Sequence, residues 1–309
     1  MTTRNFQEAF SRLQEQQVIR ASLFNLIVVT EESARKEYVK TITTHVTKRF
    51  PCRVLFITIT HSSPDIQVEV STLPETENTF CDQISIQTPP SLLEKIPFLL
   101  LPHFLTDLPI YLLWAERPDS HPLLLKQLQE WSSRLIYDSE LSPNLLDFCQ
   151  ILEKQSKTKE VVDLSWARTE SWRELIAATF YSPSRLSSLQ TAKSVEICYS
   201  TATNPFFCHT TIQATYLSAW LTASLKWNPK VSFIPKQDLR LPPGGIISID
   251  IVCQDLYHYT FHRDPDHLEQ IRILVCDEEK CEIPSKFVFS KVQSGLSLVN
   301  LIYHPERSP

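Results

Sequence analysis

The sequence predicts an α/β protein, in which an N-terminal βαβ-type sheet domain is followed by a second domain of the α+β class. Three observations lead to this prediction. Strand-like and helix-like stretches alternate in the first half of the chain, strands follow helices in the second half, and a run without apolar side chains separates the halves. A length of 309 residues also suits two cores better than one.

The first half opens with a strand, a helix and a strand. Residues 3–20 carry apolar side chains at helical spacing and predict a short amphipathic helix. A buried strand follows at 23–29, then a helix with apolar residues four apart over 34–50, then a second strand at 53–59. This order is typical of a parallel or mixed sheet covered by helices.

More strands and helices follow around an apolar, proline-marked stretch at 91–105. They are predicted strands at 66–70, 83–87, 110–114 and 135–137, and predicted helices at 123–131 and 145–153.

A polar run at residues 153–160, EKQSKTKE, is the predicted linker because it has no apolar side chain to bury. We therefore predict an N-terminal α/β domain over 1–155 and a C-terminal α+β domain over 161–309.

The second half has helices early and strands late. The predicted elements are helices at 172–180, 212–227 and near 296–302, with strands at 194–199, 231–234, 246–252, 256–262, 271–276 and 287–290.

The composition narrows the possible functions. The three glycines, at 244, 245 and 295, cannot supply a G-x-G-x-x-G or Walker A loop, which excludes the glycine-rich phosphate loops and leaves no expected cofactor. A net charge of −5 without a long Lys/Arg run makes nucleic acid an unexpected partner. We find no apolar stretch of the ~20 residues that a membrane helix needs, and no apolar signal core, and expect a cytoplasmic protein.

Several residue clusters could carry chemistry. His258 and His262 alternate with aromatic residues, which is typical of a strand that would hold them ~13 Å apart, so we expect a half-exposed strand and no metal site. Cys276 and Cys281 flank a predicted hairpin turn, DEEK; a disulfide or redox pair is conceivable, but structural thiols are favoured. Adjacent Cys208 and His209 are only a weak indication of a thiol nucleophile.

The stretch DLSWARTESWREL, residues 163–175, is the most distinctive feature; we call it the Trp–Arg segment. Ser171 and Glu174 match a capping box, and Trp172 begins an apolar helix face. Packing accounts less readily for Arg168 and Arg173 beside two indoles, since Arg with Trp is a pairing enriched at protein interfaces. A structural helix start and a functional surface therefore both remain open.

A second notable stretch is LLLPHFLTDLPIYLLW, residues 99–114, in which Asp107-Leu-Pro109 turns the chain into a strand ending at Trp114. A plain helix-to-strand connection is the simpler interpretation.

At these two stretches the sequence resembles the OpcA family of glucose-6-phosphate dehydrogenase assembly proteins. The resemblance extends to SLFNLIVV, Pro51-x-Arg53 and Asp138-Ser139, and the Trp–Arg segment is its most specific part. It implies a non-enzymatic partner of glucose-6-phosphate dehydrogenase that promotes the active oligomer in the oxidative pentose phosphate pathway. The expected partner-binding or interface-shaping residues are Asp163, Trp166, Arg168, Trp172, Arg173, Glu174, Asp107 and Trp114.

Two other functions stay open. One is a sugar-phosphate enzyme of the same pathway, such as a 6-phosphogluconolactonase-like hydrolase, with Arg168 or Arg173 holding phosphate. The other is a thiol-based regulator, in which oxidation of Cys276 and Cys281 alters partner binding.

Overall fold

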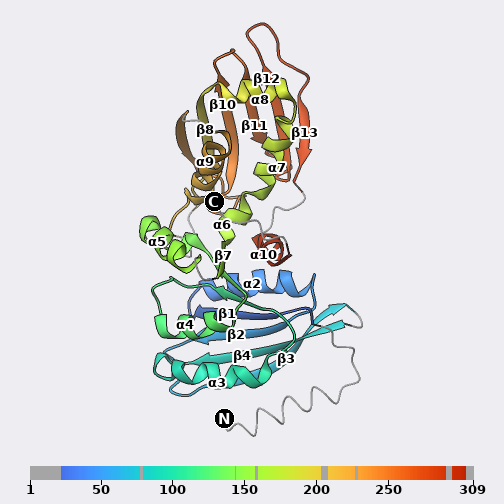
Figure 1. Ribbon diagram of the computed structural model, residues 1–309. Coiled ribbons are helices and arrows are strands. Elements are labelled where there is room, and N and C mark those ends of the chain that lie inside the picture. The colour runs from blue at the N-terminus through green and yellow to red at the C-terminus, as the bar shows by residue number, and fades with distance from the viewer. Residues whose placement is uncertain are drawn as a thin grey trace. The chain divides into compact units, whose positions relative to one another are not determined.

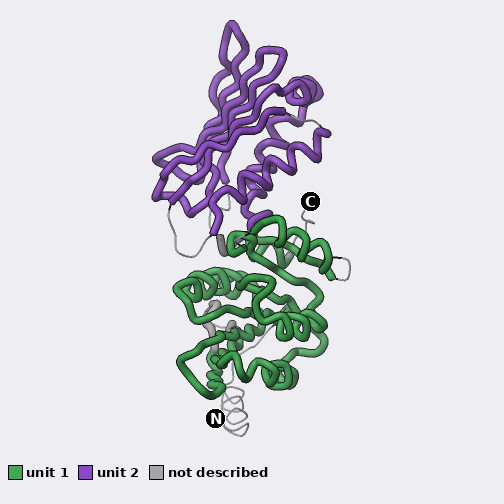
Figure 2. The backbone as a smooth tube through the Cα atoms, turned by 90° about the vertical axis from the view of Figure 1, so that its left-hand side faces the viewer, with its two compact units in different colours: residues 1–164, 295–308 green, residues 165–294, 309 purple. Residues whose placement is uncertain are grey.

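The protein is described from a computed structural model. The structure describes residues 22–76, 79–142, 144–156, 159–202, 208–226, 229–289 and 294–303. The chain divides into two compact units, unit 1 with residues 1–164 and 295–308 and unit 2 with residues 165–294 and 309 (Figure 2). The helix predicted over residues 3–20 lies outside the described residues.

Unit 1 is built on a seven-stranded sheet with the order β3-β4-β2-β1-β5-β6-β7 (Figure 1). Its strands are β1 (Asn25–Glu31), β2 (Arg53–Ile59), β3 (Gln67–Thr76), β4 (Thr79–Thr88), β5 (Ile110–Trp114), β6 (Arg134–Tyr137) and β7 (Glu160–Asp163). Neighbouring strands are parallel except for the antiparallel pair β3 and β4. The central strands read as continuous apolar runs because a parallel sheet is buried on both faces.

Helices cover this sheet. They are α2 (Arg35–Thr47), α3 (Ile96–Leu100), α4 (Pro122–Trp131), α5 (Leu145–Ser156) and α10 (Ser294–Tyr303), with 3-10 turns η1 (Pro90–Lys95), η2 (Leu101–His103) and η3 (Ser139–Leu141). Apolar residues of α3, α4 and α5, such as Leu100, Leu128 and Phe148, pack on one face of the sheet. The other face, with Leu26 and Val28, is buried as well.

Most of the polar run predicted as a linker belongs to regular structure where it is described. Helix α5 continues to Ser156, and the run ends at Glu160, the first residue of β7, a strand that the sequence analysis missed. The two units divide between Leu164 and Ser165, inside the Trp–Arg segment, and residues 295–308 return to unit 1. The predicted domain ranges 1–155 and 161–309 remain a proposal about which segments fold independently.

Unit 2 contains a six-stranded sheet with the order β13-β12-β11-β10-β8-β9, antiparallel except for the parallel pair β8 and β9. Its strands are β8 (Ala192–Ser200), β9 (Lys230–Lys236), β10 (Ile246–Cys253), β11 (His258–Arg263), β12 (Gln270–Cys276) and β13 (Ser285–Val288). Its helices are α6 (Leu164–Arg168), which begins at the last residue of unit 1, α7 (Glu170–Thr179), α8 (Pro183–Gln190) and α9 (Ile212–Leu225).

The predicted fold class is confirmed, because both units combine a mixed sheet with helices. Alternation in β11, where Tyr259 and Phe261 are buried while His258 and His262 are exposed, identified this strand correctly. Helix α8 was missed because its sequence, PSRLSSLQ, has little apolar content. Among the described residues, no helix is long and apolar enough to cross a membrane.

Candidate functional site

Two side chains of the Trp–Arg segment stack on each other in unit 2. Trp166 lies in α6 and Arg173 in α7. The guanidinium carbon of Arg173 lies 3.6 Å from the centroid of the Trp166 ring, and the residues are 8% and 4% exposed. The ring of Tyr216, from α9, meets Trp166 edge-on with 6.0 Å between centroids. A cation over an indole face is attracted by the ring quadrupole, so the stack ties α6 to α7.

Trp172 belongs to the core of unit 2. Its ring is 2% exposed and packs edge-on against Phe289, with 5.1 Å between centroids. The guanidinium of Arg263 lies 5.5 Å from the Trp172 ring and 5.3 Å from the Phe289 ring. Burial lowers the pKa of Arg263 to about 10, and Arg263 donates hydrogen bonds to the carbonyl oxygens of Ile246 and Leu268. Sequence analysis missed Arg263, because it lies far from the segment in the chain.

The start of α7 differs from the prediction. The capping box predicted from Ser171 and Glu174 is wrong, because Ser171 lies inside the helix and the N-cap residue is Thr169, whose side chain does not cap the helix. The Thr169 hydroxyl instead donates to the carbonyl oxygen of Trp166 at 2.8 Å. The predicted apolar helix face is confirmed, because its members all belong to the core of unit 2: Trp172, Leu175, Ile176 and Phe180.

Other side chains of the segment remain accessible. Glu174 is exposed on α7. Arg168 is half-buried, and its Nη1 donates to Ser165 Oγ at 3.1 Å. A partner protein that approached this segment would therefore meet Glu174 and Arg168 before it met either indole.

Asp163 is a fully buried acid at the end of β7 in unit 1. Its Oδ1 accepts a hydrogen bond from the backbone N–H of Ser139 at 3.1 Å, and the strand register places it beside Tyr137. Asp138, which lies between Tyr137 and Ser139 in the chain, pairs with Arg35 at 2.6 Å. The side chains of Asp138 and Arg35 are 0% and 5% exposed. The Ser139–Asp163 bond joins the ends of β6 and β7, and the Arg35–Asp138 pair joins the start of α2 to the end of β6. Removing one member of the buried pair would leave an unpaired charge.

The structure separates Asp107 from Trp114. Asp107 is exposed in the turn before β5, whereas Trp114 ends β5 and is fully buried, with its Nε1 donating to the carbonyl oxygen of Arg117 at 3.0 Å. A five-residue strand is ~16 Å long, so the two residues lie at opposite ends of β5 and share no surface patch. Their role in partner binding remains a prediction.

A carboxylate that sequence analysis missed lies at the edge of the sheet where the parallel strands end. Glu116 follows β5, and its Oε1 accepts hydrogen bonds from the backbone N–H of Glu31 at 2.7 Å and from the Thr30 hydroxyl at 3.1 Å. Burial raises the pKa of Glu116. Glu31 in turn contacts His121 Nε2 at 3.0 Å. The signal in the sequence was an acidic residue at the end of each apolar strand: Glu31 in β1 and Glu116 two residues after β5.

This position matters because open α/β sheets bind ligands at the carboxyl ends of their strands, where the strand order reverses. Here the reversal lies at β1, which has β2 on one side and β5 on the other. The side chain of Glu116 accepts from the backbone N–H of Glu31 at the end of β1, so a carboxylate lies at this switch point.

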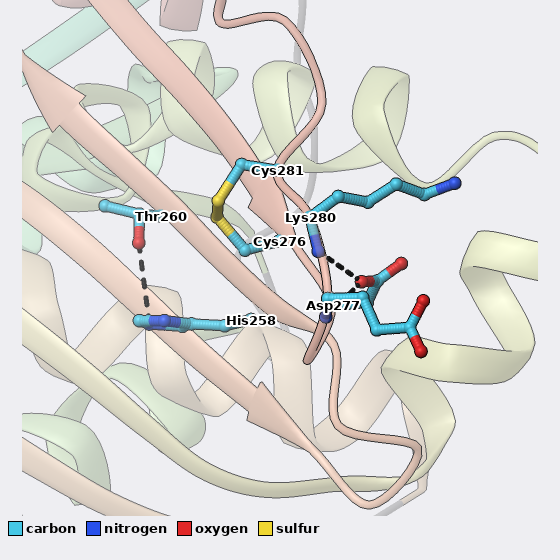
Figure 3. The surroundings of a disulfide bond; sticks show 7 residues. His258, Thr260, Cys276, Asp277, Lys280 and Cys281 are labelled. Atoms are coloured by element: carbon cyan, nitrogen blue, oxygen red, sulfur yellow. Dashed lines mark hydrogen bonds between the residues drawn. A yellow bond between two sulfur atoms is a disulfide. The ribbon is translucent and has the colours of Figure 1, made fainter.

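Cys276 and Cys281 form a disulfide across a short turn (Figure 3). The expectation of two structural thiols is therefore wrong, while the predicted hairpin turn is confirmed by a hydrogen bond from Asp277 N–H to the Lys280 carbonyl oxygen at 2.9 Å. The spacing of the two cysteines was compatible with a disulfide, but the sequence could not distinguish a disulfide from two free thiols. Whether the pair has a redox role stays a prediction.

The histidine cluster lies on an ordinary strand. His258 and Thr260 lie on the same face of β11, beside the disulfide (Figure 3). Over the residues that the structure describes, no group of three or more His, Cys, Asp or Glu side chains is placed to hold a metal ion.

Solved structures with a similar arrangement include enzymes and a regulator. A 3-ketoreductase from Actinomadura kijaniata, in complex with NADP and TDP-benzene, matches with a TM-score of 0.53 at 6% identity, covering 92% of this chain and 91% of that one. The transcriptional regulator Gal80p from Kluyveromyces lactis matches with a TM-score of 0.50 at 10% identity, covering 98% and 86%. At such low identity, these similarities show the fold alone.

Curated relatives come from cyanobacteria. A protein of Nostoc punctiforme is 28% identical over 196 residues, which cover 61% of this chain and 41% of the relative. A protein of Synechocystis sp. is 25% identical over 187 residues, covering 58% and 38%. Both are provisionally named OxPP cycle protein OpcA. The chain thus spans about 40% of the length of these relatives.

Two family models match successive parts of the chain. Residues 43–152 match the glucose-6-phosphate dehydrogenase subunit N-terminal domain, and residues 159–286 match the C-terminal domain of the same subunit. The second match contains the whole Trp–Arg segment and the unit 2 sheet up to the first two residues of β13. The chain therefore belongs to the OpcA family of glucose-6-phosphate dehydrogenase assembly proteins.

Proposed function

We propose that this protein binds glucose-6-phosphate dehydrogenase and promotes its active oligomer, without carrying out a reaction of its own. The observation that carries the proposal is the Trp–Arg segment, which lies inside the matched C-terminal family domain and is held by the Arg173–Trp166 stack. The names of the relatives point to the oxidative pentose phosphate cycle. We place the protein in the cytoplasm, with no nucleic-acid or membrane partner.

The segment suits docking because it is rigid. Trp166 and Trp172 are buried, so the α6–α7 corner can present Glu174 and Arg168 in fixed positions. A surface whose side chains are already ordered loses less conformational entropy on binding. To activate the dehydrogenase, the protein must bind its active form more tightly than its idle form, by ~1 to 3 kcal/mol for a typical coupling.

Two contacts argue against a catalytic role. Glu116 covers the backbone N–H at the end of β1, so a phosphate approaching there would meet a carboxylate. One face of the Arg173 guanidinium is already covered by Trp166, which leaves Arg173 poorly placed to hold the phosphate of a sugar-phosphate substrate. The lactonase alternative predicts that the isolated protein accelerates the hydrolysis of 6-phosphogluconolactone over the spontaneous rate.

The test is to mix the purified full chain with glucose-6-phosphate dehydrogenase from the same organism. We expect the dehydrogenase to elute earlier in size-exclusion chromatography and its turnover to rise at a fixed enzyme concentration. The proposal is rejected if neither the elution volume nor the turnover changes over a range of mixing ratios. Lactone hydrolysis and NADPH binding by the isolated chain, measured in parallel, would support an enzyme instead.

A further inference from the structure

The stretch from α3 into η2 is apolar on every side. Residues 96–102, IPFLLLP, contain no charged or hydrogen-bonding side chain. Ile96 and Leu100 are buried in the core of unit 1, on the opposite side of the sheet from α2 (Figure 1). The other side of the stretch faces solvent, where Phe98 is 76% exposed and Leu101 is 56% exposed. A helix that is apolar all round is normally buried, so these two side chains, which we call the α3 patch, lack the cover that their chemistry calls for.

The chain enters unit 1 close to the α3 patch. Asn25, the first residue of β1, is fully buried, and its side chain donates to the carbonyl oxygen of Leu105 at 3.0 Å and accepts from the Leu105 N–H at 3.0 Å. Leu105 is four residues beyond Leu101, which is at most ~14 Å along the chain. The segment that precedes β1 is therefore tethered next to the α3 patch.

Residues 3–20 have the sequence that a cover for this patch needs. They contain neither proline nor glycine, and Phe6, Phe10 and Leu13 lie on one side of the helix that the sequence predicts, at positions i, i+4 and i+7. A helix of these 18 residues would be ~27 Å long, enough to extend from residue 20 across the patch. The spacing also matches, because Phe10 and Leu13 are three positions apart, as Phe98 and Leu101 are.

We propose that residues 3–20 dock as a helix on the α3 patch of the same chain, with Phe10 beside Phe98 and Leu13 beside Leu101. The stretch from α3 through η2 runs toward the start of β1, and so does the N-terminal segment, so the two helices would lie parallel. The short tether makes the docking intramolecular, with an effective concentration of ~1 mM or more, so a small apolar contact is sufficient. This inference goes beyond the proposed function and does not depend on it.

The test is hydrogen–deuterium exchange of the full chain, with mass spectrometry of the peptides that cover residues 1–21 and 96–103. A helix of this length is only marginally stable alone in water, so slow exchange in the first peptide reports docking. We expect the backbone amides of residues 6–18 to exchange about tenfold more slowly than in an unfolded chain, because burial of one large apolar side chain stabilises the docked state by about that factor.

Phe98→Asp and Phe10→Asp should each remove this protection. Phe98 is exposed, so Phe98→Asp should keep the melting temperature within a few degrees of the wild type. Phe10→Asp leaves α3 unaltered and should speed exchange in residues 96–103, because the cover is lost. The control for Phe98→Asp is Leu146→Asp, at a leucine of α5 that is 75% exposed. The control for Phe10→Asp is Ser11→Asp, on the opposite side of the predicted helix.

Protection that both phenylalanine variants remove and both controls retain supports the proposal. Residues 3–20 that exchange at the rate of an unfolded chain overturn it, and so does protection that Phe98→Asp leaves unchanged. Protection that increases over an about hundredfold range of protein concentration would mean docking on a second copy and would reject docking within one chain. Protection that appears only after the dehydrogenase is added would reject it as well, while the proposed function would stand.

Discussion

The guanidinium of Arg173 lies 3.6 Å above the ring of Trp166, and both side chains are buried in the same unit. Packing in the core therefore explains why the Trp–Arg segment contains Trp166 and Arg173. It limits a direct role in docking to the accessible charged members, which are Glu174, Arg168 and Glu170. The buried members can act on a partner only by holding these residues in position.

Replacing Arg173 with lysine tests the stack. Lysine keeps the charge but loses the planar group that covers the indole, so we expect the free energy of unfolding to fall by about 1 to 3 kcal/mol. The fluorescence of Trp166 should shift as its ring loses its cover. Arg49→Lys, at an exposed position, is the control and should change stability by less than about 0.5 kcal/mol. Urea unfolding measures both variants, and equal effects would contradict a structural role for the stack.

Reversing the charge of Glu174 tests docking without disturbing the fold. Glu174 is exposed, so Glu174→Arg should leave the melting temperature within a few degrees of the wild type. If the segment meets the dehydrogenase, the Kd of the complex should rise about tenfold or more, since like charges across an interface repel. Glu130→Arg, on α4 of unit 1, is an exposed helical control. Titration calorimetry that gives the same Kd for both variants would exclude Glu174 from the interface.

Glu116 should make stability depend on pH. Burial raises its pKa, the Glu31 carboxylate raises it further, and hydrogen bonds from Glu31 N–H and Thr30 and the charge of Arg35 lower it. For a raised carboxyl pKa, the stabilising contribution is complete below the unfolded value of about 4.5 and is lost as the pH rises through the folded pKa. Glu116→Gln keeps the acceptor oxygen without the charge.

We therefore expect Glu116→Gln to be more stable than the wild type at pH 7 and the difference to disappear below about pH 4.5. Thermal unfolding of both proteins from pH 4 to pH 8 measures this difference. A constant gap between the two curves would show that Glu116 does not titrate differently in the folded and unfolded states.

The regular elements could be predicted where the periodicity was strong. Residues 23–29 and 53–59 are nearly continuous apolar runs, and they form the central strands β1 and β2. Strand β7 was missed because it is four residues long and follows a polar run. A short strand at the edge of a sheet buries too few side chains to leave a clear pattern.

The contacts of the candidate site could be predicted less well. The sequence identified the Trp–Arg segment, but the residues that hold it come from distant parts of the chain: Tyr216 against Trp166, and Arg263 and Phe289 against Trp172. No local pattern relates these positions, because the tertiary packing of unit 2 brings them together. The capping box failed for a similar reason, since α6 runs into α7 through Thr169 and leaves no free helix start at Ser171.

The disulfide between Cys276 and Cys281 gives the last prediction. The two cysteines are five positions apart in the chain. By the loss of chain entropy in the unfolded state, a cross-link that closes so short a loop stabilises the folded chain by about 2 kcal/mol. Cys276→Ser combined with Cys281→Ser should lower the free energy of unfolding by roughly that amount. Wild-type protein treated with dithiothreitol should behave like the variant, and dithiothreitol should leave the variant unchanged.

The regulatory hypothesis adds a second measurement to the same samples. Glu282, one residue beyond the bridge, pairs with Arg185 at 2.7 Å, so the bridge lies beside a surface ion pair. If the bridge controls docking, reduction should change the Kd for the dehydrogenase in the wild-type protein and not in the double serine variant. A loss of stability with an unchanged Kd would leave the disulfide a structural cross-link, because the turn would then lie outside the surface that the partner contacts.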